Sequence, residues 1–197
     1  MRAVRIPVLS IAAYPVGMRP WTPDAYADAY RFAAEAHQGQ LVPGTQLPYL
    51  MHLSLVSMEV MGAIHVEEVR DPDLAVQCAL LHDALEDTDA TVDSLRSRFD
   101  PAVVAGVQAL TKDSALPKAE RMADSLLRIR DQPHEVWMVK LADRTTNLMP
   151  PPSHWDLDKR RRYHAEAETI LDALGQGSAH LAQRLRTRLE SYREHLR

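Results

Sequence analysis

Apolar residues recur three and four positions apart along most of the chain after residue 20, which predicts helices. Polar cap residues followed by proline mark three helix starts, at Thr22-Pro23, Asp71-Pro72 and Asp100-Pro101. We expect helices over about 22–39, 49–64, 72–84, 91–99, 101–111, 117–130, 134–148, 156–174 and 178–195, with a proline- and glycine-rich loop over 40–48. No segment alternates as a strand does, so the pattern predicts an all-α domain of about eight or nine helices.

The composition fits one globular domain. The 197 residues are 46% hydrophobic and 25% charged, enough to bury a core, and we place the domain over residues 21–197. Residues 1–20 are expected to form a poorly specified N-terminal arm. They place two arginines before a short apolar stretch, but Pro7 interrupts it and no small-residue cleavage site follows, so export is not favoured.

The net charge and the cysteine content bear on which partners and which cell compartment to expect. A net charge of −4 argues against a nucleic-acid partner, and no segment reaches the ~18 apolar residues that a membrane span needs. Cys78 is the lone cysteine, so no internal disulfide can form, and we expect a buried thiol in a cytoplasmic protein.

In the last helix Leu181, Leu185 and Leu189 share a face with Tyr192. This face is expected to be core, with self-association into a homo-oligomer as the alternative.

The segment His82-Asp83-Ala-Leu-Glu86-Asp87 concentrates polar groups in an apolar stretch. Residues three and four apart share a helix face, so these four side chains should form one patch. Three carboxylates together without a nearby lysine are electrostatically costly, and a bound cation would remove that cost. The alternative is a solvated helix end whose acids cluster without a ligand.

His52 and Asp143 also lie in apolar helical stretches. Each alone is more often a hydrogen-bonded core residue than a metal ligand. Together with His82 and Asp83 they offer two imidazoles and two carboxylates from three helices. Such a mixed nitrogen and oxygen set suits manganese, iron or zinc, and suits calcium poorly.

Several segments occur together in an order typical of one family: Ala34-Glu-Ala-His37-Gln-Gly39-Gln40, Pro48-Tyr49-Leu-Met-His52, Leu81-His82-Asp83-Ala-Leu-Glu86-Asp87-Thr88, Leu110-Thr111-Lys112 and Lys140-Leu-Ala-Asp143-Arg144-Thr-Thr-Asn147-Leu148. Over residues 24–174 the chain resembles the HD-type hydrolase domain of the RelA/SpoT-homologue family, specifically the stand-alone small alarmone hydrolases. The resemblance implies a manganese-dependent enzyme that removes the 3′-pyrophosphate from hyperphosphorylated nucleotides such as guanosine tetraphosphate.

The resemblance also assigns roles to individual residues. The metal-ligand positions fall on His52, His82, Asp83 and Asp143. The positions that activate or orient the attacking water fall on Glu86 and Asp87, and a substrate-binding position falls on Asn147. We also expect Tyr49 to bind substrate, and Arg144, beside Asp143, to neutralise phosphate charge, with an ordinary surface cation as the alternative for Arg144. His37 is expected to be structural, and Lys140 to be an ordinary cation on the helix surface.

One departure concerns the nucleobase. Guanosine-directed members of the family place basic residues in the loop after the His-x-Gly-Gln motif, whereas Leu41-Val-Pro-Gly-Thr45 has none. A proline-containing loop exposes carbonyl oxygens and lacks one amide donor, which favours the amino group of adenine over the carbonyl of guanine. We therefore expect a preference for adenosine 3′-pyrophosphates. The alternatives are another HD-type nucleotidase or phosphodiesterase, and a non-catalytic nucleotide sensor; the intact set of candidate residues argues against the sensor.

Overall fold

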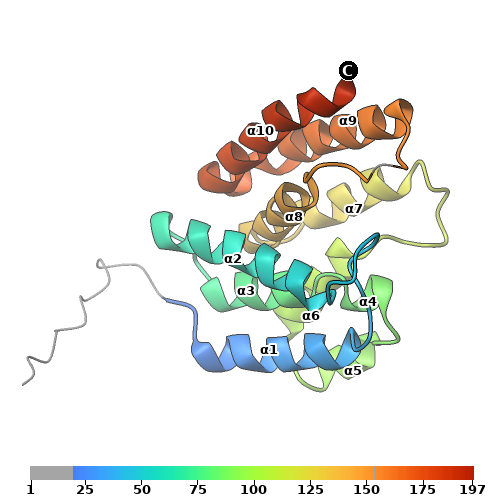
Figure 1. The fold of residues 1–197 in the computed structure, drawn as a ribbon. Coiled ribbons are helices and arrows are strands. Elements are labelled where there is room, and N and C mark those ends of the chain that lie inside the picture. The colour runs from blue at the N-terminus through green and yellow to red at the C-terminus, as the bar shows by residue number, and fades with distance from the viewer. Residues whose placement is uncertain (1–19, 153) are drawn as a thin grey trace, which may run out of the picture.

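The computed structural model describes residues 20–152 and 154–197 (Figure 1). The predicted N-terminal arm therefore lies outside the described residues, except for Pro20. The helices are α1 (Pro23–Ala36), α2 (Leu50–Val66), α3 (Pro72–Leu81), α4 (Ala84–Asp87), α5 (Val92–Arg96), α6 (Pro101–Leu110), α7 (Arg121–Arg130), α8 (His134–Asn147), α9 (Leu157–Leu174) and α10 (Ala179–Tyr192), with 3₁₀ turns at Gly175–Gly177 and Arg193–Leu196. The described part contains no strand beyond one isolated bridge between Leu41 and Pro48, so the all-α prediction is confirmed.

Local capping explains where several helices begin. The Thr22 hydroxyl accepts from the amide of Ala25, and the Asp71 carboxylate accepts from the amide of Leu74. Thr91 and Ser94 form a reciprocal capping box at the start of α5. These side chains satisfy amide groups that have no partner inside the helix, which is why the sequence marks these starts clearly.

Helices α1 and α5 end about three residues earlier than predicted, at Ala36 and Arg96, and two further boundaries differ for reasons that the structure shows. The helix expected over 72–84 divides into two helices: α3 ends at Leu81, and α4 begins at Ala84. The Nδ1 atom of His82 donates to the carbonyl oxygen of Ala79 (2.9 Å) at this break. The helix expected from residue 117 begins only at Arg121, whose guanidinium donates to the carbonyl oxygens of Leu116 and Ser114 in the preceding turn.

The core lies around α3 and α8. Helix α3 contacts α1, α2, α6 and α8, and α8 in turn contacts α9 and α10, which run antiparallel at one end of the molecule (Figure 1). The apolar face of α10 is buried, as predicted for core, and Cys78 is buried in α3. No helix within the described ranges combines the length and the apolar character of a membrane span.

Candidate metal centre

Three packed helices bring the four candidate ligands together. His52 lies in the first turn of α2, His82 and Asp83 follow the end of α3, and Asp143 lies in the last turns of α8. Each of α2, α3 and α8 contacts the other two. Residues up to 91 positions apart in the chain therefore lie close together in the fold. Helix periodicity within each segment does not predict which helices bring them together.

The ligand atoms of His52, His82 and Asp83 all lie within 4.8 Å of one another, a spacing that suits one ion, and Asp143 lies beside both imidazoles. The Nε2 atom of His82 lies 3.0 Å from Oδ2 of Asp83 and 3.8 Å from Oδ1 of Asp143, and the corresponding distances from Nε2 of His52 are 3.7 and 3.5 Å. An ion with bonds of about 2.1 Å holds neighbouring ligand atoms roughly 3.0–3.4 Å apart, depending on its geometry. The cluster is thus slightly wider than, and compatible with, a transition-metal site.

Two buried ring nitrogens support this fit. The Nε2 atoms of His52 and His82 are buried and find no hydrogen-bond partner among the described residues. Buried polar atoms normally have a partner, and an ion bound between these two nitrogens would supply one to each. Because the carbonyl oxygen of Ala79 can only accept, Nδ1 of His82 carries a proton and Nε2 is the atom free to bind an ion.

The electrostatics of the cluster follow from its burial. Burial lowers the pKa of His82, but the carboxylates of Asp83 and Asp143 outweigh it and raise this pKa to about 9. Burial in the same way favours the neutral form of Asp83, but His82 outweighs this effect and holds the pKa of Asp83 below its usual range. Without an ion, these carboxylates favour a second proton on His82 at Nε2, which lies 3.0 Å from Oδ2 of Asp83, and a bound ion would compete with that proton.

The prediction that Lys140 is a surface cation is wrong. Its side chain is buried, and its Nζ atom donates to Oδ2 of Asp143 at 2.9 Å. Residues 140 and 143 lie one turn apart on the buried face of α8, so the lysine neutralises the carboxylate from within the same helix. Asn147, one turn further, donates from Nδ2 to Oδ1 of Asp143 (2.5 Å). Asp143 is thus oriented from both sides, and the predicted substrate contact of Asn147 stays a prediction.

Glu86 and Asp87 lie on α4, beside the four candidate ligands. Glu86 accepts from the backbone amide of Lys112 (3.0 Å) and from its Nζ atom (2.7 Å). The assumption that no lysine neighbours the acidic patch is therefore wrong: the lysine comes from the loop after α6. Burial, followed by the charges of Asp83 and Glu86, raises the pKa of Asp87. A groove of about 880 Å³ opens next to Glu86 and Lys112 and runs between α4, α5, α6 and α7.

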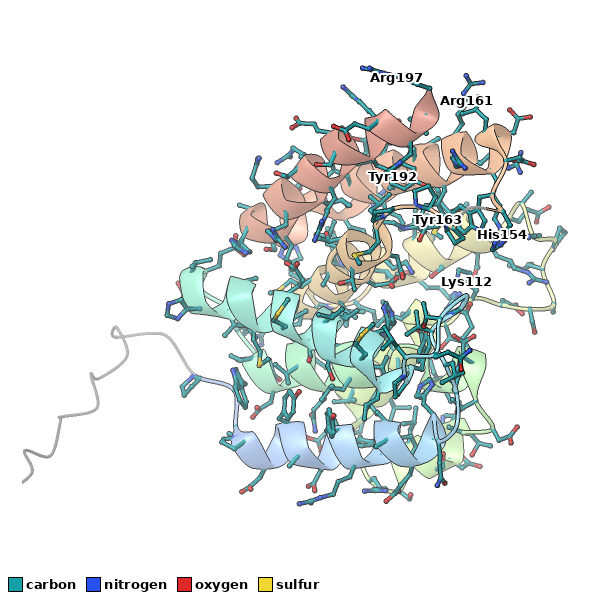
Figure 2. All side chains as sticks on the ribbon, viewed as in Figure 1. Lys112, His154, Arg161, Tyr163, Tyr192 and Arg197 are labelled. Carbon is teal, nitrogen blue, oxygen red and sulfur yellow. The ribbon has the colours of Figure 1, made fainter. Side chains whose placement is uncertain are left out.

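Tyr49 and Arg144, both predicted to bind substrate, make internal contacts. The Tyr49 hydroxyl donates to Oδ2 of Asp83 at 2.5 Å and lies 3.4 Å from Oδ2 of Asp87. Arg144 is buried and donates to Glu166, with its guanidinium 4.4 Å from the ring centre of Tyr163. Figure 2 shows Tyr163 on α9, on the side that faces α8. The motif residues after Asp143 therefore also join α8 to α9.

Sequence reasoning gave no role to Lys112 and did not connect His37 with Tyr49. Lys112 lies 26 residues from its partner Glu86, so helix spacing offers no signal for this contact. The ring of His37 stacks on that of Tyr49 with 4.9 Å between the ring centres, in keeping with its expected structural role. The contact between Lys140 and Asp143 has the three-residue spacing of a helix pair, so its signal was present in the sequence.

The fold and the site match known proteins. The HD-domain family profile matches residues 29–185. Guanosine-3′,5′-bis(diphosphate) 3′-pyrophosphohydrolase MESH1 of Danio rerio is 32% identical over 163 residues, covering 80% of this chain and 88% of that protein. The Homo sapiens protein of the same name is 30% identical over 155 residues, covering 75% and 83%. The bifunctional (p)ppGpp synthase/hydrolase SpoT of Escherichia coli is 34% identical over 152 residues, which make up 20% of its own length.

A solved structure agrees with the sequence matches. It is described as a metazoan ortholog of SpoT that hydrolyzes ppGpp and plays a role in starvation responses. It superposes with a TM-score of 0.76 at 25% identity and covers 88% of this chain and 98% of its own. The chain belongs to the HD-domain family, and the fold expected from the resemblance is confirmed.

Proposed function

We propose that this protein is a metal-dependent 3′-pyrophosphohydrolase of hyperphosphorylated nucleotides. The observation on which the proposal rests is the convergence of two imidazoles and two carboxylates, with buried unpartnered Nε2 atoms, next to the carboxylates of Glu86 and Asp87. The names of the relatives support the reaction, since three of them are 3′-pyrophosphohydrolases or include a (p)ppGpp hydrolase.

In this proposal the ion is held by His52, His82, Asp83 and Asp143. We expect the ion to be manganese, and we expect the protein to be cytoplasmic. A bound divalent ion of this kind polarises a phosphoryl oxygen and lowers the pKa of bound water. Asp87, whose pKa is raised, and Glu86 orient the attacking water and accept its proton. Lys112, paired with Glu86, keeps a positive charge at the edge of the site.

The proposed substrate preference is for adenosine over guanosine 3′-pyrophosphates. Leu41 and Leu47 are exposed in the loop between α1 and α2, and this loop contains no cation. Its carbonyl oxygens at Leu41 and Pro43 accept no hydrogen bond from any described residue. Such acceptors match the amino group of adenine better than the carbonyl oxygen of guanine. The names of the relatives favour guanosine instead, so hydrolysis of guanosine 3′-pyrophosphates is the second candidate function.

A comparison of purified nucleotides tests both candidates. The protein loaded with manganese is incubated with adenosine and guanosine 3′-pyrophosphates, and kcat/KM is measured for each. Release of pyrophosphate is expected, with at least a tenfold preference for the adenosine nucleotide, because an unmatched hydrogen-bonding group in a closed site costs roughly 1–3 kcal/mol. Equal or guanosine-favouring values would refute the adenosine preference and leave the hydrolase proposal intact.

Asp83→Ala serves as the negative control for this assay. The variant is expected to lose metal binding and pyrophosphate release together, because Asp83 faces both imidazoles. Full activity of Asp83→Ala, or no pyrophosphate release from any nucleotide by the metal-loaded wild type, would refute the hydrolase proposal.

A further inference from the structure

Tyr49 occupies a position between the candidate metal ligands and the candidate water-orienting group. It precedes α2, three residues before His52, and its side chain is almost entirely buried. Its hydroxyl donates to Oδ2 of Asp83 at 2.5 Å, and the distance from the same hydroxyl to Oδ2 of Asp87 is 3.4 Å. The hydroxyl has a single hydrogen, which goes to Asp83, and it also lies beside Asp87.

The geometry leaves Asp83 free to bind an ion while it accepts from Tyr49. The oxygen that accepts from Tyr49 is the one that faces His82 at 3.0 Å and His52 at 3.7 Å. A carboxylate oxygen has two lone pairs, so it can bind an ion with one and accept a hydrogen bond with the other. Because the carboxylate of Asp83 can only accept, the Tyr49 hydroxyl is the donor of this hydrogen bond.

The tyrosine ring is itself fixed by the loop between α1 and α2. It stacks on the ring of His37 with an interplanar angle of 20°, and Nδ1 of His37 makes a 2.5 Å hydrogen bond with Oε1 of Gln40. The backbone amide of Tyr49 donates to the carbonyl oxygen of Gln40 at 2.9 Å. Gly39 allows the turn between these partners, because its φ of +79° is a conformation that other residues rarely adopt.

We propose that Tyr49 is a positioning residue that aligns Asp83 for the metal ion beside Asp87, with the His37–Gln40 pair as its support. This inference rests on the proposed hydrolase function and replaces the expected substrate contact of Tyr49. Groups that orient metal ligands through a hydrogen bond typically change metal affinity or activity by about 10–100-fold when they are removed.

Tyr49→Phe tests the proposal, because it removes the hydroxyl and keeps the ring that stacks on His37. Manganese affinity is measured by calorimetry without nucleotide, and kcat and KM are measured at saturating manganese. We expect manganese affinity and kcat each to fall about 10-fold or more, with KM within about twofold of the wild type. The matched control is Tyr192→Phe, a buried tyrosine on α10 whose hydroxyl has no partner among the described residues; it should leave all three quantities unchanged.

Unchanged manganese affinity, or an unchanged kcat at saturating manganese, would overturn the proposal. A rise in KM alone would show that Tyr49 contacts the substrate. The manganese affinity is measured without nucleotide, so this measurement tests the role of Tyr49 even if the wild type cleaves none of the nucleotides. A lack of cleavage would refute only the proposed function. If Tyr49→Phe does not fold, His37→Ala takes its place: it keeps the hydroxyl but removes its support, and both quantities should fall by a smaller factor.

Discussion

At the residue scale, three of the four carboxylates near the candidate ion have a donor of their own. Asp83 accepts from Tyr49, Asp143 accepts from Lys140, and Glu86 accepts from Lys112. These donors offset the repulsion at Asp83, Asp143 and Glu86, whereas the charges of Asp83 and Glu86 still raise the pKa of Asp87. The stronger reason to expect an ion is that the buried Nε2 atoms of His52 and His82 both face the carboxylate of Asp83, because imidazole and carboxylate groups together suit a transition metal.

Glu86→Gln separates metal binding from turnover. The carboxylate of Glu86 accepts from Lys112, and Glu86 is not part of the group of possible metal ligands around His52 and His82. The variant should therefore keep its manganese affinity. If Glu86 accepts a proton from water, kcat should fall by roughly 10²–10⁴-fold, the usual contribution of a general base. Calorimetric manganese titration and steady-state kinetics measure the two effects. Equal losses of affinity and rate would identify Glu86 as a ligand and contradict its assigned role.

At the element scale, the close packing of α3, α6 and α8 holds two sides of the site together. Gly106 lies in the middle of α6, where a Cβ atom would come within 2.7 Å of Sγ of Cys78 on α3 and 2.9 Å of Cγ2 of Val136 on α8. Glycine is otherwise unfavourable inside a helix by about 1 kcal/mol relative to alanine. The residue is therefore explained by the closeness of the neighbouring helices and not by backbone conformation.

Gly106→Ala should destabilise the protein despite the better helix propensity of alanine. Overpacking of a core typically costs about 1–3 kcal/mol, which exceeds the propensity gain. Gly62→Ala in α2 is the matched control, since its nearest neighbour would be Nε2 of His180 at 3.9 Å, and it should stabilise by up to ~1 kcal/mol. Urea unfolding of both variants gives the two free energies. A Gly106→Ala protein at least as stable as the wild type would show that α6 moves away from α3 and α8 at little cost.

At the scale of the whole molecule, the C-terminal helix α10 packs against two of the helices that contain candidate ligands. Arg184 on α10 donates from Nε to buried Glu59 on α2 at 2.8 Å, and the carboxylate of Glu67 accepts from the hydroxyl of Ser178 at the start of α10. Helix α10 thus holds α2, which contains His52, against α8, which contains Asp143. Since the ligands meet only in the folded chain, metal binding and folding should be linked.

The stability of the metal-free protein should therefore depend on pH. The pKa of His82 is about 9 in the fold against 6.5 for an unperturbed histidine, so the folded state binds its proton more tightly than the unfolded state. The resulting stabilisation is complete below pH 6.5 and is lost as pH rises towards 9. Urea unfolding with a chelator should give a free energy that falls over this range. Saturating manganese should remove the fall, because the ion then takes the place of the proton.

His82→Gln is the control for this measurement and should abolish the fall in the metal-free protein. A free energy of unfolding that is flat or rises between pH 6.5 and 9 in the metal-free wild type would contradict the protonated state of His82. Retention of the full pH dependence by His82→Gln would assign the effect to another group.

The sequence alone determined the helical class, most helix starts and the identity of the residues that form the candidate site. These are local properties: caps, proline positions and apolar spacing act within a few residues, and the motifs are contiguous. The tertiary structure alone decided how the charges of the site are balanced. The partners of Asp83 and Glu86 lie 34 and 26 residues away, at Tyr49 and Lys112, and the break after Leu81 aims the ring of His82 at the cluster. Such contacts depend on which helix faces pack together, and that depends on the whole set of apolar surfaces and not on any single segment.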